Sequence, residues 1–141
     1  MNAPEDLPEV DEYSRLRKPP HSVEAEQSVL GALLIDNAAL AQIPDLTAAD
    51  FYRHEHRLIF AAAQALISAG TLADVITVFE RLQAAGQALD VGGLPYLNDL
   101  AQSVPSSAGI KRYGEIVAER ALRREIIAAA DNIATEAFNP Q

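Results

Sequence analysis

The 141-residue chain has no cysteine, no tryptophan and only two lysines, Lys18 and Lys111. Without cysteine it can form neither a disulfide framework nor a thiolate zinc site. Its apolar runs are too short to cross a membrane as a helix, and its acidic first residues do not resemble a signal peptide. These absences predict a cytoplasmic protein with no membrane partner.

Basic residues are also scarce, and the formal net charge is −9. An acidic domain does not attract nucleic acid through its overall field, so we expect no strong direct nucleic-acid binding. Alanine, leucine and isoleucine are abundant, whereas segments that alternate β-branched and polar residues are few. The length and this pattern predict a single all-α domain.

Residues 1–18 differ in composition from the rest. Acidic side chains crowd before the first basic residue, Arg15, and large apolar residues are few. A segment of this kind buries too little apolar surface to fold, so we predict a disordered acidic tail. A short recognition segment around Tyr13 and Leu16 is the alternative interpretation.

The segment 19–36 is the one around which the head is organised. Pro19 and Pro20 require an extended approach, after which Ser22 is placed to cap a helix. Gly31 lies on the apolar side of that helix, where glycine costs about 1 kcal/mol relative to alanine. Because glycine allows another backbone to come close, we predict a helix crossing at this position.

Four more short helices complete a predicted compact head over residues 19–105. Asn37 is expected to cap the second helix, at 38–43, and Asp74 the fourth, while the third spans about 53–69. Pro95 suits the first position of the fifth helix. The expected core positions on the last three of these helices are His56, Ile59, Phe60, Ala63, Leu66, Ile67, Val75, Val78, Phe79, Leu82, Leu94, Leu97, Leu100 and Val104. Phe51 and Tyr52 are expected at the core edge.

The last helix is predicted to be much longer than the others, from 108 to 137, with Ser106 or Ser107 as its cap. At ~1.5 Å per residue it spans about 44 Å, whereas a head of this size is about 25–30 Å across. The helix must therefore project, although its far half carries Leu122, Ile126, Ile127, Ile133 and Phe138. We interpret residues 106–141 as the first arm of a helical hairpin that needs a partner.

Three arginines, Arg120, Arg123 and Arg124, lie on this helix among glutamates at helical spacing. The spacing predicts a salt-bridged, solvent-exposed side. A nucleic-acid contact is the alternative, which the acidic surroundings and the lack of nearby aromatic residues disfavour.

Catalytic patterns are few. Neither lysine follows a glycine, so no Gly-Lys-Ser/Thr nucleotide loop is present, and no cofactor is expected in this chain. His54 and His56 point to different sides of a helix, and no third metal ligand is evident. The helix dipole explains Glu24 and Glu26 in a first turn. A small enzyme that uses these carboxylates and histidines is the rival hypothesis, which a carboxylate with a raised pKa would support.

The stretch Pro19-Pro20-His21-Ser22-x-Glu24-Ala25-Glu26-Gln27-Ser28-Val29-Leu30-Gly31 resembles the opening signature of the bacterial replicative DNA helicase (DnaB) family, in its N-terminal domain. The resemblance continues through Asp50-Phe51-Tyr52, Gly92-Gly93-x-x-Tyr96-Leu97 and Glu119-Arg120-Ala121, and it extends from about residue 19 to the end. Gly109 departs from the family pattern, which usually has asparagine there, and this departure would loosen the start of the last helix.

The resemblance implies a non-catalytic part of an ATP-dependent 5′–3′ DNA helicase. In this family the ATP- and magnesium-binding motor domain follows the N-terminal domain, and it is absent from these residues. Family members are hexamers whose N-terminal domains pair through their hairpins as a trimer of dimers. That collar is the docking platform for the C-terminal domain of primase and contributes to contacts with helicase loaders.

Two sets of site residues follow from this resemblance and from the long helix. The expected self-association residues are Tyr113, Ile116, Val117, Ile126, Ile127 and Ile133. The candidate primase contacts are Glu24, Tyr96, Ile127 and Ile133. Core packing of Tyr96 against Leu100 is an equal alternative, and for Glu24 the helix-start interpretation is preferred. A freestanding adaptor or regulator of replication is the alternative function.

Overall fold

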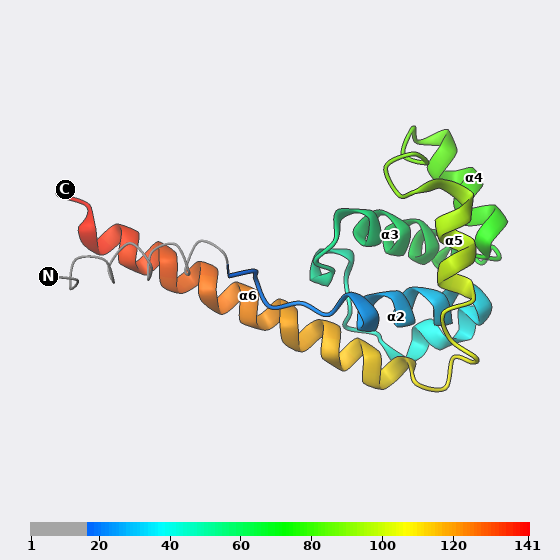
Figure 1. Cartoon of the computed structure of the whole chain (residues 1–141), viewed down its shortest axis with the longest axis horizontal. Coiled ribbons are helices and arrows are strands. Elements are labelled where there is room, and N and C mark those ends of the chain that lie inside the picture. Colours follow the sequence, from blue (N-terminus) through cyan, green and yellow to red (C-terminus); the bar gives the residue numbers. More distant parts are fainter. Residues whose placement is uncertain (1–16) are drawn as a thin grey trace, which may run out of the picture.

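The computed structural model describes residues 17–141, and over that range it is entirely helical, as the composition predicts. The elements in chain order are α2 (Val23–Ile35), the 3-10 helices η1 (Asn37–Gln42) and η2 (Ala48–Asp50), α3 (His54–Ser68), α4 (Val75–Ala84), α5 (Gly93–Ala101) and α6 (Ile110–Phe138). Helices α2 to α5 form a head, and α6 passes along α2 and extends far beyond it (Figure 1). Residues 1–16 of the predicted tail, which include Tyr13 and Leu16, are outside the described range.

Helix α2 lies at the centre of the core, where it packs against α3, α5 and α6. Most of its apolar residues are buried, including Val29, Leu30 and Leu33. The predicted core positions are confirmed at His56, Ile59, Phe60, Ala63, Val78, Leu82, Leu97, Leu100 and Val104. The predicted positions that are only half-buried are Tyr52, Leu66, Ile67, Val75, Phe79 and Leu94. Phe51 closes the core beside Phe60, with 4.9 Å between the ring centroids.

The predicted helix crossing at Gly31 is confirmed. A Cβ atom on Gly31 would lie 2.2 Å from the carbonyl oxygen of Leu100 and 2.6 Å from Oγ of Ser103. Helix α5 therefore crosses α2 at a distance that only glycine permits, since real Cβ atoms do not approach so closely.

Of the caps predicted for the first, second and fourth helices, two are confirmed and one is wrong. The side chains of Ser22 and Asp74 accept hydrogen bonds from the backbone of α2 and α4. Asp36, not Asn37, caps η1 by accepting from the N–H of Ala38. The amide of Asn37 instead joins the distant backbone of Ala73 in both directions, at 2.7 and 2.9 Å.

The starts of the last two helices also differ from the prediction. Gly92 and Gly93, with φ of 92° and 67°, begin α5, so Pro95 is its third residue rather than its first. Helix α6 begins after Gly109, which has no side chain to cap it. Neither of the two predicted serines is the cap. The hydroxyl of Ser106 accepts from the N–H of Ala108 at 3.3 Å, in the turn before the helix. The hydroxyl of Ser107 donates to Asp36 at 2.7 Å, which ties the loop before α6 to the end of α2.

The projection of α6 is confirmed. Its 29 residues span about 43 Å at 1.5 Å per residue. Its last buried residue is Ala121, and every residue from Glu125 onward is exposed, so the head leaves the far half of the helix uncovered (Figure 1). None of the helices in residues 17–141 combines the length and apolar content that a membrane crossing requires.

Candidate assembly surface and the network behind it

The far half of α6 presents large apolar side chains to solvent. The exposed fractions are 56% for Leu122, 59% for Ile126, 47% for Ile127, 70% for Ile133 and 88% for Phe138. Leu122, Ile126 and Ile133, together with Ala129, recur at intervals of three or four residues, so they share one side of the helix. We call these four residues the arm seam.

The other predicted self-association residues lie nearer the head. Tyr113 and Ile116 are half-buried against the core, and Val117 is only 2% exposed within it. Val117 follows Ile110 and Gly114 at helical spacing on the side that faces the head. Because this side chain is used by the core of its own chain, Val117 is excluded from the surface that a partner can reach.

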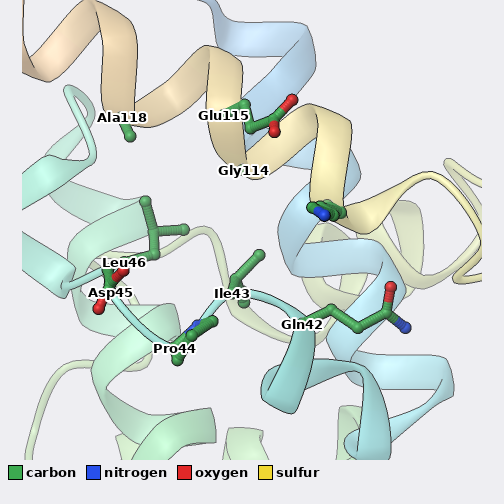
Figure 2. Close-up of a pocket in the computed structure, with 9 residues that line it drawn as sticks. Gln42, Ile43, Pro44, Asp45, Leu46, Gly114, Glu115 and Ala118 are labelled. Carbon is green, nitrogen blue, oxygen red and sulfur yellow. The ribbon is translucent and has the colours of Figure 1, made fainter.

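A shallow groove lies where the base of α6 passes the loop between η1 and η2. Its volume is about 300 Å³, and it is lined by Gln42, Ile43, Pro44, Asp45, Leu46, Lys111, Gly114, Glu115 and Ala118. Figure 2 shows the loop residues on one side and α6 on the other, with the side chain of Ile43 directed at the helix near Gly114. A Cβ atom on Gly114 would lie 2.7 Å from Cγ2 of Ile43.

A row of polar side chains linked by hydrogen bonds crosses the head, and we call it the polar chain. The carboxylate of Glu26, which is 1% exposed, lies 2.7 Å from Nδ1 of fully buried His56. Nε2 of His56 lies 2.6 Å from the hydroxyl of Tyr96, and the oxygen of that hydroxyl accepts from the amide of Gln27 at 3.2 Å. The other oxygen of Glu26 accepts from the backbone N–H of Tyr52 at 2.7 Å. The chain thus connects α2, α3, α5 and the loop before α3.

The protonation states of Glu26 and Tyr96 in the polar chain follow from their contacts. Burial raises the pKa of Glu26, but hydrogen bonds from His56 and from the N–H of Tyr52 outweigh it, so the pKa lies below the usual 4.5. An ionised Glu26 accepts from Nδ1–H of His56, which leaves Nε2 to accept from Tyr96. Burial is the largest influence on the hydroxyl of Tyr96, and its pKa is raised, so the phenol keeps its proton.

This geometry weakens the enzyme hypothesis. Glu26 is a buried, hydrogen-bonded acceptor with a lowered pKa, whereas a general acid needs a raised one. Glu24 is exposed and does not share the site. His54 is exposed, and within residues 17–141 no three histidine, aspartate or glutamate side chains are grouped to hold a metal ion. Sequence reasoning took Glu26 for a helix-dipole residue and missed its pairing with His56, 30 positions away.

Arg124 forms a joint where α6 leaves the head. Its guanidinium donates to the carbonyl oxygens of Pro20 at 2.8 Å and Asp50 at 2.7 Å, and it lies 5.5 Å from the ring of Tyr52. The ring of His21 stacks on Tyr52 at 4.1 Å. The prediction of an exposed salt bridge is therefore wrong for Arg124. The sequence did contain a signal that Arg124 faces the head. Arg124 lies one turn beyond Ala121 and so continues the helical spacing of the buried side of α6.

The neighbouring arginines do follow the prediction. Arg123 pairs with Glu119 at 3.0 Å, one turn earlier on the same helix, and Arg120 also pairs with Glu119. Both arginines are on the solvent side of α6, where such pairs contribute little to stability.

Comparisons with known proteins agree with this architecture. The sequence model of the DnaB-like helicase N-terminal domain matches residues 18–119. The replicative DNA helicase DnaB of Geobacillus stearothermophilus is 41% identical over 123 residues, which are 86% of this chain and 27% of that protein. The crystal structure of the N-terminal domain of DnaB helicase from Mycobacterium tuberculosis has a TM-score of 0.83 at 37% identity, covering 86% of this chain and 87% of that one.

A second solved structure is described as a DnaB-like replicative helicase and its interactions with primase. It has a TM-score of 0.73 at 30% identity and covers 82% of this chain and 27% of that one. The head with its projecting helix thus defines the class, the N-terminal domain of a replicative DNA helicase. The chain belongs to the DnaB-like helicase N-terminal domain family. It spans about a quarter of the length of the curated relative from Geobacillus.

Proposed function

We propose that this domain is an assembly and recruitment module of a cytoplasmic hexameric replicative helicase. It pairs with other copies through α6 and offers a docking surface to the C-terminal domain of primase and to a helicase loader. The hydrolysis of ATP with magnesium belongs to the motor domain of such helicases and not to these residues. The observation that supports the proposal is the set of exposed apolar side chains on the far half of α6.

The energetics favour a partner on this helix. Burying one isoleucine or leucine side chain contributes about 1.5–3 kcal/mol relative to leaving it in water. Ile126, Ile127 and Ile133 are each about half exposed or more, so their burial in an interface yields several kcal/mol in all. Exposed apolar groups that gather on one element are typical of protein interfaces.

For primase, the candidate contacts are Glu24, Tyr96, Ile127 and Ile133. The similarity to a helicase whose structure concerns primase interactions supports such a role. Glu24 is exposed at the start of α2, and Tyr96 is half-buried with its hydroxyl held by His56 and Gln27. The ring of Tyr96 is therefore held in place by the polar chain, so a contact there does not require the side chain to be ordered on binding.

Sedimentation tests the self-association. Ile127→Asp should weaken it by at least about tenfold, because an ionised carboxylate would have to be desolvated in the interface. Ala128→Asp, an exposed neighbour on a different side of the same turn, is the control and should have a smaller effect. An unchanged oligomer for Ile127→Asp would contradict this interface.

Co-migration with the isolated C-terminal domain of primase tests the recruitment. The wild-type domain should shift it on a sizing column, and Ile133→Asp should reduce the shift. If the wild-type domain and the primase domain migrate independently at concentrations well above the micromolar range, the recruitment role of this domain alone is refuted.

A further inference from the structure

Glu26 is the branch point of the polar chain. One oxygen of its carboxylate lies 2.7 Å from Nδ1 of His56 and also accepts from the backbone N–H of Arg53 at 3.4 Å. The other oxygen accepts from the backbone N–H of Tyr52 at 2.7 Å. Within the described part of the chain, every buried side-chain nitrogen and oxygen has a hydrogen-bond partner. A single buried carboxylate therefore holds both the imidazole of His56 and the backbone that leads into α3.

The branch through His56 leads to Tyr96. Because Glu26 accepts from Nδ1–H of His56, Nε2 is left to accept from the hydroxyl of Tyr96, 2.6 Å away. The amide of Gln27 donates to the oxygen of the same hydroxyl, and the rings of His56 and Tyr96 lie within 5° of parallel. Both the proton and a lone pair of this hydroxyl are thus directed. The orientation of the half-buried Tyr96 ring depends on the tautomer that Glu26 imposes on His56.

The branch through the backbone leads to the arm. The segment 50–53, which provides the N–H donors to Glu26, is also the seat of α6. Arg124 donates to the carbonyl oxygen of Asp50 at 2.7 Å and lies 5.5 Å from the ring of Tyr52. It is two residues beyond Leu122, the first residue of the arm seam. Because the seat and the donors belong to one short piece of backbone, a displacement of one displaces the other.

Stability alone is a weak explanation for a carboxylate in this core. Desolvation of a buried charge offsets much of what its partners contribute, and apolar residues of similar volume are often as stabilising as a buried charged pair. A fully hydrogen-bonded polar network does, however, fix one arrangement of its side chains. The polar chain is such a network, and its two branches end at Tyr96 and at the joint of the arm.

We infer that Glu26 is a positioning residue that couples the seat of the arm to the position of Tyr96. The inference rests on the proposed function, in which Tyr96 contacts the primase domain and α6 contacts other copies, and it adds a link between the two surfaces. With Arg124 seated, the loop holds Glu26 in the arrangement that directs His56 and Tyr96. With Tyr96 held by a partner, the same hydrogen bonds hold the loop and the seat. The coupling is reciprocal, because it is one free energy shared by two sites.

The ring nitrogens of His56 report this coupling without any partner. In the full chain with ¹⁵N-labelled histidine, NMR should show His56 protonated at Nδ1. Glu26→Gln should mix the two tautomers, because an amide can either accept or donate. Arg124→Ala should move the His56 signals in the same direction as Glu26→Gln does. Arg123→Ala, which breaks only a surface pair on the same helix, is the control and should leave them unchanged.

The coupling must also act from Tyr96 toward the arm. Tyr96→Phe removes only the hydroxyl, and it should speed hydrogen exchange at the N–H groups of Tyr52 and Arg53, which donate to Glu26. The N–H groups of α4 are the internal control, because a general loss of stability would affect them as well. Exchange at Tyr52 and Arg53 that rises no more than exchange in α4 would overturn the inference.

Affinity for the C-terminal domain of primase connects the link to function. Arg124→Ala and Glu26→Gln should each weaken binding by about fivefold, the lower end of typical couplings between sites. Arg123→Ala should have no such effect. The double variant of Arg124→Ala and Glu26→Gln should bind no more weakly than either single variant, because both changes act through the same link. Losses that multiply in the double variant would show independent effects and would contradict the coupling.

The outcomes separate the inference from the proposed function. If the wild-type domain does not bind the primase domain, but Arg124→Ala moves the His56 signals and Tyr96→Phe frees the loop, the recruitment fails and the positioning role of Glu26 stands. If the primase domain binds, but Arg124→Ala changes neither the His56 signals nor the affinity more than Arg123→Ala does, the recruitment stands and the inference is overturned.

Discussion

Replacing Gly31 with alanine should destabilise the head, although alanine is the better helix former. Alanine in place of glycine within a helix gains about 1 kcal/mol. The added Cβ would lie 2.2 Å from the carbonyl oxygen of Leu100, a backbone atom of α5 that cannot move alone. Helix α5 must shift away from α2, which loosens the contacts of Leu97 and Leu100 with the core. Overpacking of this kind costs typically about 1–3 kcal/mol, and more when backbone must move.

The expected net loss for Gly31→Ala is therefore about 1–2 kcal/mol, a considerable part of the 5–15 kcal/mol that holds an ordinary domain together. Gly114→Ala is the matched control. There the Cβ would meet side-chain atoms alone, Cγ2 of Ile43 at 2.7 Å and its Cβ at 3.7 Å, and that methyl group can move when the side chain changes rotamer. The helix-propensity gain should offset most of the clash, so we expect a change within about 1 kcal/mol of zero.

Urea unfolding followed by circular dichroism gives the free energy of unfolding for both variants, with the slope showing whether the transition stays two-state. The reasoning is refuted if Gly31→Ala is as stable as the wild type or more stable. It is also refuted if Gly114→Ala lowers the free energy of unfolding as much as Gly31→Ala does, because a backbone atom is expected to move less easily than a side-chain methyl group.

Further predictions concern the polar chain and the joint. Glu26→Gln should cost about 1–3 kcal/mol at neutral pH, since it weakens a charge-assisted hydrogen bond to His56. Because the pKa of Glu26 is lowered on folding, its stabilisation is complete above 4.5 and is lost as the pH falls through the lower folded value. The wild-type and Glu26→Gln unfolding free energies should therefore converge in acid, and a pH-independent difference would contradict this. Tyr96→Phe should cost about 1 kcal/mol, measured in urea, because His56 loses its donor, and a neutral effect would argue against that bond. Arg124→Ala should speed hydrogen exchange in the loop that precedes α3, whereas Arg123→Ala, which breaks only a surface pair, should not.

Several features of the fold could be predicted from the sequence because they depend on neighbours along the chain. Ser22 and Asp74 cap their helices through amides three residues away, which any sequence window contains. The projection of α6 could be predicted by comparing its uninterrupted length with the size of the rest of the chain. Its exposed apolar residues followed from the same comparison, since no head residues were left to cover them.

The local errors had a common cause. Asp36 and Asn37 are adjacent and both suit a helix cap, so the choice between them depended on a distant partner. Asn37 is held by Ala73, and Ser107 is turned away from α6 by Asp36. In each case the side chain that the local pattern predicted as a helix cap forms a hydrogen bond with a residue distant in the sequence instead.

The amino-acid sequence by itself determined an all-helical head, the glycine at its closest crossing and an arm too long for the head to cover. Only the tertiary structure decided that Glu26 meets His56 and Tyr96, that Val117 belongs to the core, and that Arg124 holds the arm at the loop before α3. The physical reason is the range of the interactions. Helix periodicity and capping act over one turn, whereas these pairings join residues 30 to 104 positions apart and exist only once the helices have packed.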